Sequence, residues 1–116
     1  MIEVKDHSVL TSMLIYPAHP KLAKIMEWLV KEFSHVVITC AYEDRDYPSV
    51  HSVVPFRGID IRSHIYEDPQ AVAEKLNEHW IYDPERPWKK CALYHDTGRG
   101  PHIHLQVHDR TIMKKE

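Results

Sequence analysis

The sequence contains few cysteines, and the two that it has are isolated. Among its 116 residues only Cys40 and Cys91 are cysteines, and neither belongs to a Cys-x-x-Cys or Cys-x-x-His pair. Structural zinc sites are usually rich in cysteine, and disulfide frameworks need several paired cysteines. We therefore expect neither a disulfide framework nor a cysteine cage around a metal.

Long apolar runs and an excess of one charge are also absent. No segment approaches the roughly 20 apolar residues of a transmembrane helix, and the first residues lack the basic region and apolar run of a signal peptide. We therefore expect a protein that is cytoplasmic as synthesised and has no membrane partner. Fifteen Lys and Arg residues against 17 Asp and Glu give a formal net charge of −2. The interspersed signs argue against a broad phosphate-binding surface, and hence against a nucleic-acid partner.

Length and hydrophobic pattern predict one α+β domain, residues 1–116, with a small antiparallel sheet and helices packed on one face. A chain of this length buries about two-thirds of its unfolded surface, enough for one core. Residues 20–33 and 69–79 carry apolar side chains at helical spacing after an initial proline, and Asp68 is the expected N-cap of the second helix. β-branched or alternating residues predict strands at 36–41, 57–61, 91–94 and 103–107, the last two forming a hairpin.

Two histidines share one face of the last predicted strand. Side chains alternate along a strand, so His102 and His104 point the same way. Asp60 lies between two isoleucines of strand 57–61 and also points away from the core. With His51 upstream, the chain has a separated His, Asp, His set. Zinc accepts these ligand types, and three protein ligands with a fourth position left to water are typical of a catalytic site.

The order of these residues resembles that of a known family. His51, then Gly58-Ile59-Asp60, then His102-Ile103-His104 is similar to the zinc D-Ala-D-Ala peptidase family, within the superfamily that includes lysostaphin-type peptidases and the hedgehog fold. The resemblance spans roughly residues 36–107. It implies a fold of that type, one zinc ion held by His51, Asp60 and His104, and His102 as the catalytic histidine.

The resemblance also implies a reaction and a substrate. Family members hydrolyse amide bonds of peptidoglycan peptide stems, as carboxypeptidases or endopeptidases, often at D-amino acid bonds. A short member without a signal peptide resembles phage or prophage cell-wall proteins, and would reach the wall by lysis or with a virion. A peptidoglycan peptide is the expected partner, and the sequence gives no expectation for the oligomeric state.

The acid and the arginine of the family pattern have to come from other positions. Pro101 stands where members often carry an acid three residues before the last ligand. Glu43 stands where an arginine would follow the family's tyrosine. Glu43 and Asp44 are therefore candidate general bases, and Arg45 and Arg57 are candidate substrate-binding residues.

His95 is a further candidate beside the predicted turn at residues 97–100. It could bind substrate or orient a metal ligand. Its neighbour Asp96 is at least as well explained as a residue that caps the turn.

Two other functions stay open. Because the usual acid is missing, the chain could keep zinc and the fold while serving as a non-catalytic binding module, as the hedgehog branch does. The His-hydrophobic-His strand also occurs in single-strand DNA nickases, where a tyrosine nucleophile follows it. No tyrosine follows His104, and the acidic balance disfavours this alternative.

Overall fold

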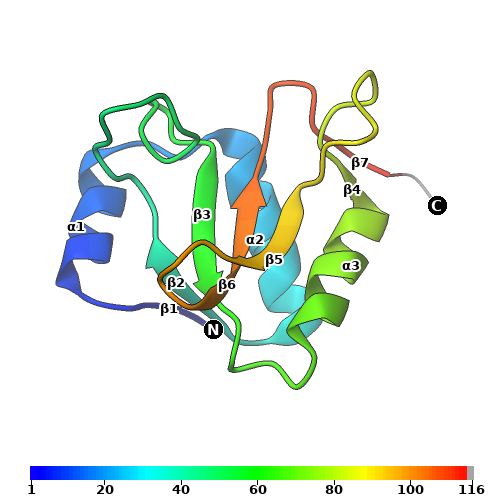
Figure 1. The fold of residues 1–116 in the computed structure, drawn as a ribbon, viewed down its shortest axis with the longest axis horizontal. Helices are drawn as coiled ribbons and strands as arrows, with labels where there is room; N and C mark the ends of the chain where they lie inside the picture. The colour runs from blue at the N-terminus through cyan, green and yellow to red at the C-terminus, as the bar shows by residue number, and fades with distance from the viewer. Residues whose placement is uncertain (115–116) are drawn as a thin grey trace.

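A five-stranded sheet organises the chain in the computed structural model, which describes residues 1–114 (Figure 1). The strand order is β1-β2-β3-β6-β5, with β1 parallel to β2 and the other pairs antiparallel. Three helices accompany this sheet in the described residues, so the predicted α+β class is confirmed. The strands are β1 (Ile2–Val4), β2 (Val36–Cys40), β3 (Gly58–Arg62), β5 (Ala92–Asp96) and β6 (Pro101–Gln106).

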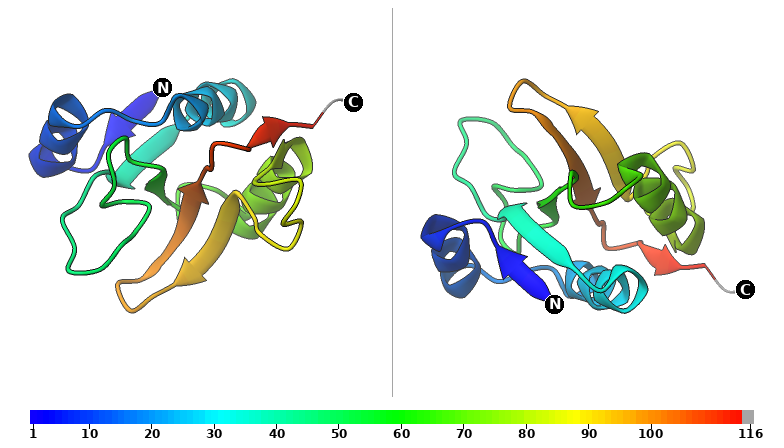
Figure 2. Two further views of the ribbon diagram at one scale, coloured as in Figure 1. Left: turned by 90° about the horizontal axis from the view of Figure 1, so that it is seen from above. Right: turned by 90° about the horizontal axis from the view of Figure 1, so that it is seen from below.

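Two amphipathic helices have the predicted bounds. Both α2 (Pro20–Phe33) and α3 (Pro69–His79) begin with proline, whose fixed φ suits the first helical position. The Asp68 carboxylate accepts a hydrogen bond from Ala71 N at 3.1 Å and caps α3, as predicted. Figure 2 shows α2 and α3 on the side of the sheet away from the loop between β2 and β3 and the turn between β5 and β6. Their buried side chains are Leu22, Ile25, Met26, Leu29, Val72, Ala73 and Leu76.

Alternation along β3 and β6 separates the core from a polar face. Ile59, Ile61, Ile103 and Leu105 are at most 1% exposed and pack towards the helices. The residues between them, including Asp60 and both histidines of β6, point to the opposite face. The polar residues of the candidate site therefore share the face of the sheet that α2 and α3 leave uncovered.

The first helix, α1 (His7–Ile15), was not predicted and lies elsewhere. Its N-cap is Asp6, whose carboxylate accepts from Val9 N at 3.1 Å, and Val9 is its only buried residue. Figure 1 shows α1 beyond β2, at one side of the sheet. The prediction that the helices pack on one face therefore holds for α2 and α3. It is wrong for α1, which borders the polar face.

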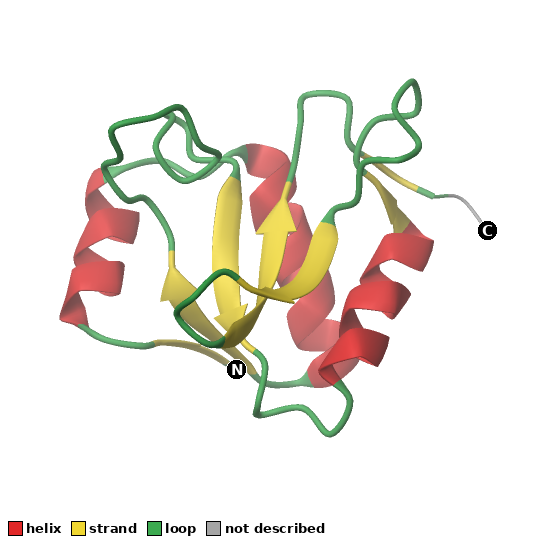
Figure 3. Cartoon of the chain, in the orientation of Figure 1, coloured by secondary structure: helices red, strands yellow, loops and turns green. Residues whose placement is uncertain are grey.

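A long loop and a second small sheet complete the fold. Residues 41–57 connect β2 to β3 without a helix or strand (Figure 3). Strands β4 (Trp80–Ile81) and β7 (Ile112–Met113) pair antiparallel beyond α3. In residues 1–114, none of the helices combines the length and apolar character that crossing a bilayer requires.

Candidate metal centre

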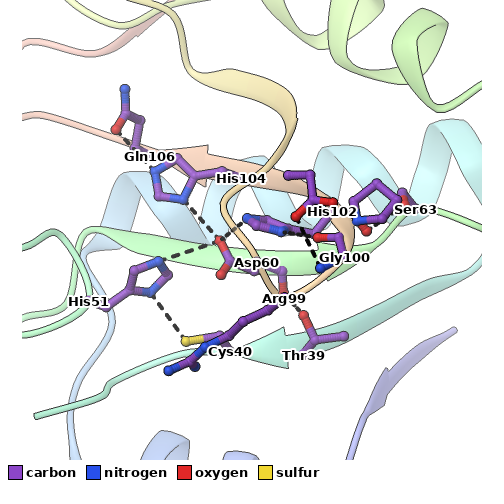
Figure 4. A network of polar contacts seen from close by, with 12 residues as sticks. Thr39, Cys40, His51, Asp60, Ser63, Arg99, Gly100, His102, His104 and Gln106 are labelled. Carbon is purple, nitrogen blue, oxygen red and sulfur yellow. Dashed lines mark hydrogen bonds and ion pairs between the residues drawn. The ribbon is translucent and has the colours of Figure 1, made fainter.

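Three histidines meet around one carboxylate oxygen of Asp60. Asp60 Oδ1 lies 2.9 Å from His104 Nδ1, 3.4 Å from His51 Nε2 and 3.8 Å from His102 Nε2 (Figure 4). All four side chains are at most 17% exposed. The structure thus brings together the three predicted metal ligands and the predicted catalytic histidine.

Strand register places Asp60 and His104, and the long loop places His51. Asp60 and His104 are directly opposite each other in the β3–β6 pair. His51 is 2% exposed, and its backbone oxygen accepts from Glu43 N at 2.9 Å. Gly58 lets the loop approach, because a Cβ there would lie 2.3 Å from Val50 Cγ2. The missing side chain of Gly58 therefore helps to position His51.

Both histidines predicted to be ligands, His51 and His104, lie between two hydrogen-bond acceptors. His51 Nδ1 is 2.9 Å from Ala41 O, while its Nε2 faces Asp60. A neutral imidazole has one N–H and one lone pair, so it can donate to only one of two acceptors. If Nδ1–H donates to Ala41 O, a cation between Nε2 and Asp60 would accept the Nε2 lone pair.

His104 is placed in the same way. Its Nε2 lies 3.1 Å from Gln106 Oε1, and its Nδ1 faces Asp60. The Gln106 amide is oriented, because its Nε2 donates to Lys90 O at 2.8 Å. If Nε2–H donates to Gln106 Oε1, a cation between Nδ1 and the carboxylate would accept the Nδ1 lone pair.

Two contacts of Asp60 have the spacing of ligands around a divalent cation, and in the described residues the group with metal-site spacing throughout is Cys40, His51 and Asp60. A neutral imidazole that donates one N–H to an outer partner presents the other nitrogen as a metal ligand, which is the usual arrangement around zinc. Zinc bonds of about 2.0–2.2 Å in a tetrahedron separate N and O ligand atoms by roughly 3.4 Å. The distances of 2.9 Å and 3.4 Å from Asp60 Oδ1 to the two histidine nitrogens lie close to that separation.

The Asp60 carboxylate stays ionised in this environment. Burial alone would raise its pKa, but hydrogen bonds and charge interactions with His104 and His51 outweigh burial and lower the pKa below its ordinary value. A negatively charged carboxylate is therefore present in this cluster throughout the physiological pH range.

Cys40 adds a donor that sequence reasoning missed. Its Sγ lies 3.7 Å from His51 Nδ1 and 3.5 Å from Glu43 Oε2. Ligand atoms of Cys40, His51 and Asp60 all lie within 4.8 Å of one another, so this group could hold a metal ion. Burial, followed by the charges of Asp60 and Glu43, raises the pKa of Cys40 to about 12. The metal-free thiol is therefore protonated rather than a nucleophilic thiolate.

A register shift explains why Cys40 faces the site. Ile38 pairs with Ile61 and points into the core, whereas Cys40 pairs with Asp60, so β2 has one extra residue over this stretch. Strict alternation would put Cys40 on the same face as Ile38. An irregularity of the kind a β-bulge makes re-aims the side chain. Only an expected pairing of strand 36–41 with strand 57–61 could have suggested this position.

His95 belongs to the same cluster. Hairpin pairing sets it opposite His102, with ring centroids 4.9 Å apart, and its ring is 5.8 Å from that of His104. Burial, then the neighbouring His102 and His104, lowers the pKa of His95. Asp96 caps the adjacent turn, accepting from Gly98 N at 2.8 Å. A neutral His95 is thus available as a hydrogen-bonding group beside His102.

A cavity of about 1000 Å³ is lined by Cys40, Asp60 and His102 and by both candidate bases, whereas His51 and His104 do not line it. Glu43 Oε1 is 3.5 Å from Arg45 Nε, and its other oxygen faces Cys40. Asp44 instead accepts a hydrogen bond from Tyr42 Oη at 2.9 Å. Glu43 is therefore the candidate base that contacts the donor cluster directly.

The two candidate arginines lie in different places. Arg45 lines the cavity and donates to Ser49 Oγ at 3.0 Å. Arg57 donates to Val107 O at 3.1 Å and contacts Tyr82 Oη at 3.4 Å, which ties the loop to the end of β6. The structure does not bring Arg57 to the cavity. Two arginines that the sequence did not single out, Arg62 and Arg99, line it instead.

Comparisons with known proteins add no relative to this picture. No protein-family model, curated protein or solved structure matches the chain. The resemblance to the zinc D-Ala-D-Ala peptidase family therefore stays a prediction from the motif residues. Any function assigned to the site has to be argued from the geometry of those residues and their neighbours.

Proposed function

We propose that the protein is a zinc-dependent hydrolase that cleaves amide bonds in the peptide stems of peptidoglycan. The observation that carries the proposal is the placement of His51 and His104, each between Asp60 and an outer acceptor. A dication at the shared position would satisfy all three ligands with neutral imidazoles and one carboxylate. The residues that would hold zinc are His51, Asp60 and His104.

A zinc ion bound there would supply a Lewis acid for the scissile carbonyl and lower the pKa of a water molecule. The chain itself supplies the proton-transfer groups. His102 Nε2 is 3.8 Å from Asp60 Oδ1, and the side chain is 17% exposed, so it borders both the ligand set and the cavity. In the proposal His102 transfers a proton or stabilises the negative charge that develops on the carbonyl oxygen.

Glu43 is the proposed proton acceptor. Its carboxylate is 40% exposed in the cavity and lies 3.5 Å from Arg45, which would hold it in place. Arg99 Nη1 is 4.0 Å from the same carboxylate and is largely exposed, so it is free to turn towards a substrate carboxylate. A cavity with these acids and arginines suits a peptide that carries its own carboxylates and amines.

The test is release of new amino groups from purified peptidoglycan by the zinc-loaded protein. Wild type should release them, and His102→Ala should not, although it should still bind zinc. His7→Ala is the matched control, because His7 is an exposed histidine at the start of α1. Absence of release by zinc-loaded wild type, across soluble stem peptides as well as intact peptidoglycan, would contradict the hydrolase proposal.

A non-catalytic zinc-binding module is the second candidate. The proximity of Cys40 to His51 and Asp60 favours it, because a fourth protein ligand closes a zinc site as structural sites are closed. In that case the loaded protein would bind stem peptides without hydrolysing them. Binding measured by calorimetry together with unchanged peptide would support the module over the hydrolase.

A further inference from the structure

Cys40 lies in line with two of the proposed ligands across the sheet. It pairs with Asp60 across β2 and β3, and Asp60 pairs with His104 across β3 and β6. The three side chains therefore form one row on the polar face. Figure 4 shows the sulfur of Cys40 near the His51 ring, at the side of Asp60 away from Gln106. Cys40 therefore places a sulfur donor next to the proposed ligands Asp60 and His104.

We propose that Cys40 is an exchangeable fourth ligand that closes the metal centre while no substrate is bound. The inference rests on the proposed metal centre of His51, Asp60 and His104. Zinc–sulfur bonds of about 2.3 Å in a tetrahedron place sulfur roughly 3.6 Å from the other ligand atoms. The donor atoms of Cys40, His51 and Asp60 lie within 4.8 Å of one another, so a shift of the Cys40 sulfur from its place 3.7 Å from His51 Nδ1 towards the Nε2 side of the ring would complete the coordination.

Proton balance for this step is simple. The thiol gives up its proton to solvent when sulfur bonds to the cation, as metal-bound cysteine does. One metal–sulfur bond forms and one S–H bond breaks, without oxidation. When an oxygen ligand from a substrate replaces sulfur, the thiolate takes a proton back from solvent. Coordination by Cys40 is thus reversible without any further reactant.

The position of Cys40 suits exchange rather than permanent closure. Cys40 lines the open cavity, so an entering ligand reaches the same side of the centre. Cys91 lies outside the cavity, because it is fully buried in the hydrophobic core immediately before β5. Both cysteines are free thiols. The chain therefore contains a matched control for every test of Cys40.

Cobalt substitution tests the inference by a signal other than activity. Thiolate bound to Co²⁺ absorbs in the near ultraviolet by charge transfer, whereas nitrogen and oxygen ligands do not. Cobalt-loaded wild type should show this band, Cys91→Ser should keep it, and Cys40→Ser should lose it while still binding cobalt. Addition of acetohydroxamate, a metal-binding probe with two oxygen donors, should remove the band from wild type and leave the cobalt bound.

The cobalt experiment distinguishes a failure of the Cys40 inference from a failure of the proposed metal centre. Cobalt bound to wild type without a charge-transfer band would overturn the role of Cys40 and leave the proposed metal centre intact. No binding of cobalt or zinc by wild type would instead remove the proposed function itself. A band that persists at saturating acetohydroxamate would contradict the exchange.

A second measurement covers the case in which Cys40→Ser does not fold. In wild type, zinc should slow the reaction of one thiol with an aromatic disulfide reagent by at least tenfold, and a chelator should restore the rate. Peptide mapping should identify Cys40 as the protected thiol. An equal rate with and without zinc, when zinc is bound, would overturn the inference.

Discussion

Gln106 orients His104 through a hydrogen bond of 3.1 Å between Oε1 and Nε2, and its own amide nitrogen is fixed by Lys90 O. The two residues are two positions apart on β6, so their side chains lie on the same face. This contact determines which nitrogen of His104 faces Asp60. It thereby connects a residue outside the proposed ligand set to the metal affinity that we propose for the site.

Gln106→Leu should weaken zinc binding without abolishing it. The substitution removes the acceptor that holds the His104 ring, and loss of such an outer partner typically costs about 10–100-fold in metal affinity. Competition with a coloured chelator measures the change. Gln70→Leu, in α3 and far from the site in sequence, is the control and should leave the affinity unaltered.

His102→Ala should separate catalysis from metal binding. His102 is the most distant of the three histidines from Asp60 Oδ1, at 3.8 Å, so its loss should leave the zinc content unchanged. Loss of a general acid or base typically lowers kcat by about 10²–10⁴-fold. A variant that loses its zinc together with its activity would show instead that His102 is a ligand.

Gly58→Ala should disturb the proposed metal centre by displacing the loop that carries His51. The new Cβ would lie 2.3 Å from Val50 Cγ2 and 3.2 Å from Leu105 O, so the loop that carries His51 must move. Overpacking of this kind costs about 1–3 kcal/mol of stability, and we expect a parallel loss of zinc affinity. Denaturant titration and chelator competition measure the two effects.

The rescue for that variant is a second substitution. Val50→Ala removes the Cγ2 atom that the new Cβ would meet at 2.3 Å and leaves the Val50 Cβ at 3.0 Å. Gly58→Ala with Val50→Ala should therefore recover part of the stability and zinc affinity that Gly58→Ala alone loses. A double variant no better than the single one would show that the steric explanation is wrong.

Acid should destabilise the protein in part through Asp83. Its carboxylate accepts from Arg86 Nε at 2.7 Å and from Glu85 N at 3.0 Å, and these contacts lower its pKa. Because the folded pKa is lower than the unfolded one, the unfolded chain binds more protons in acid. The contribution is present above the ordinary pKa of a carboxyl group and is lost as pH falls below it.

Asp83→Asn should therefore flatten the fall in stability between about pH 5 and pH 2. The free energy of unfolding at a series of pH values measures this slope. Asp46→Asn, at an exposed position in the loop after β2, is the comparison. Equal slopes for the Asp83 variant and wild type would contradict the role of this contact.

Periodicity predicted the elements that bury a regular face. The helices at 20–33 and 69–79 and the alternating strands around Asp60 and His104 have that property, and all are observed. Helix α1 was missed because it buries only Val9, while Leu14 and Ile15 are 78% and 64% exposed. Strand β1 was missed because three residues are too few to show a period.

Contacts within the candidate site could be predicted where they depend on alternation along one strand. They could not be predicted where they depend on the register between two strands. The shared face of His102 and His104 follows from alternation within β6. The approach of Cys40 to Asp60 depends on a register shift between two strands, which no period in the sequence indicates. The approach of His95 to His102 likewise depends on the hairpin register.

Metal content is the most direct test of the central claim. Native mass spectrometry of tag-free protein, exposed to zinc and then desalted, should show about one zinc ion per wild-type chain. Asp60→Ala and His104→Ala should lose it, and His102→Ala should keep it. Wild type that binds no zinc, or an Asp60→Ala variant that retains a full complement, would contradict the metal centre around Asp60.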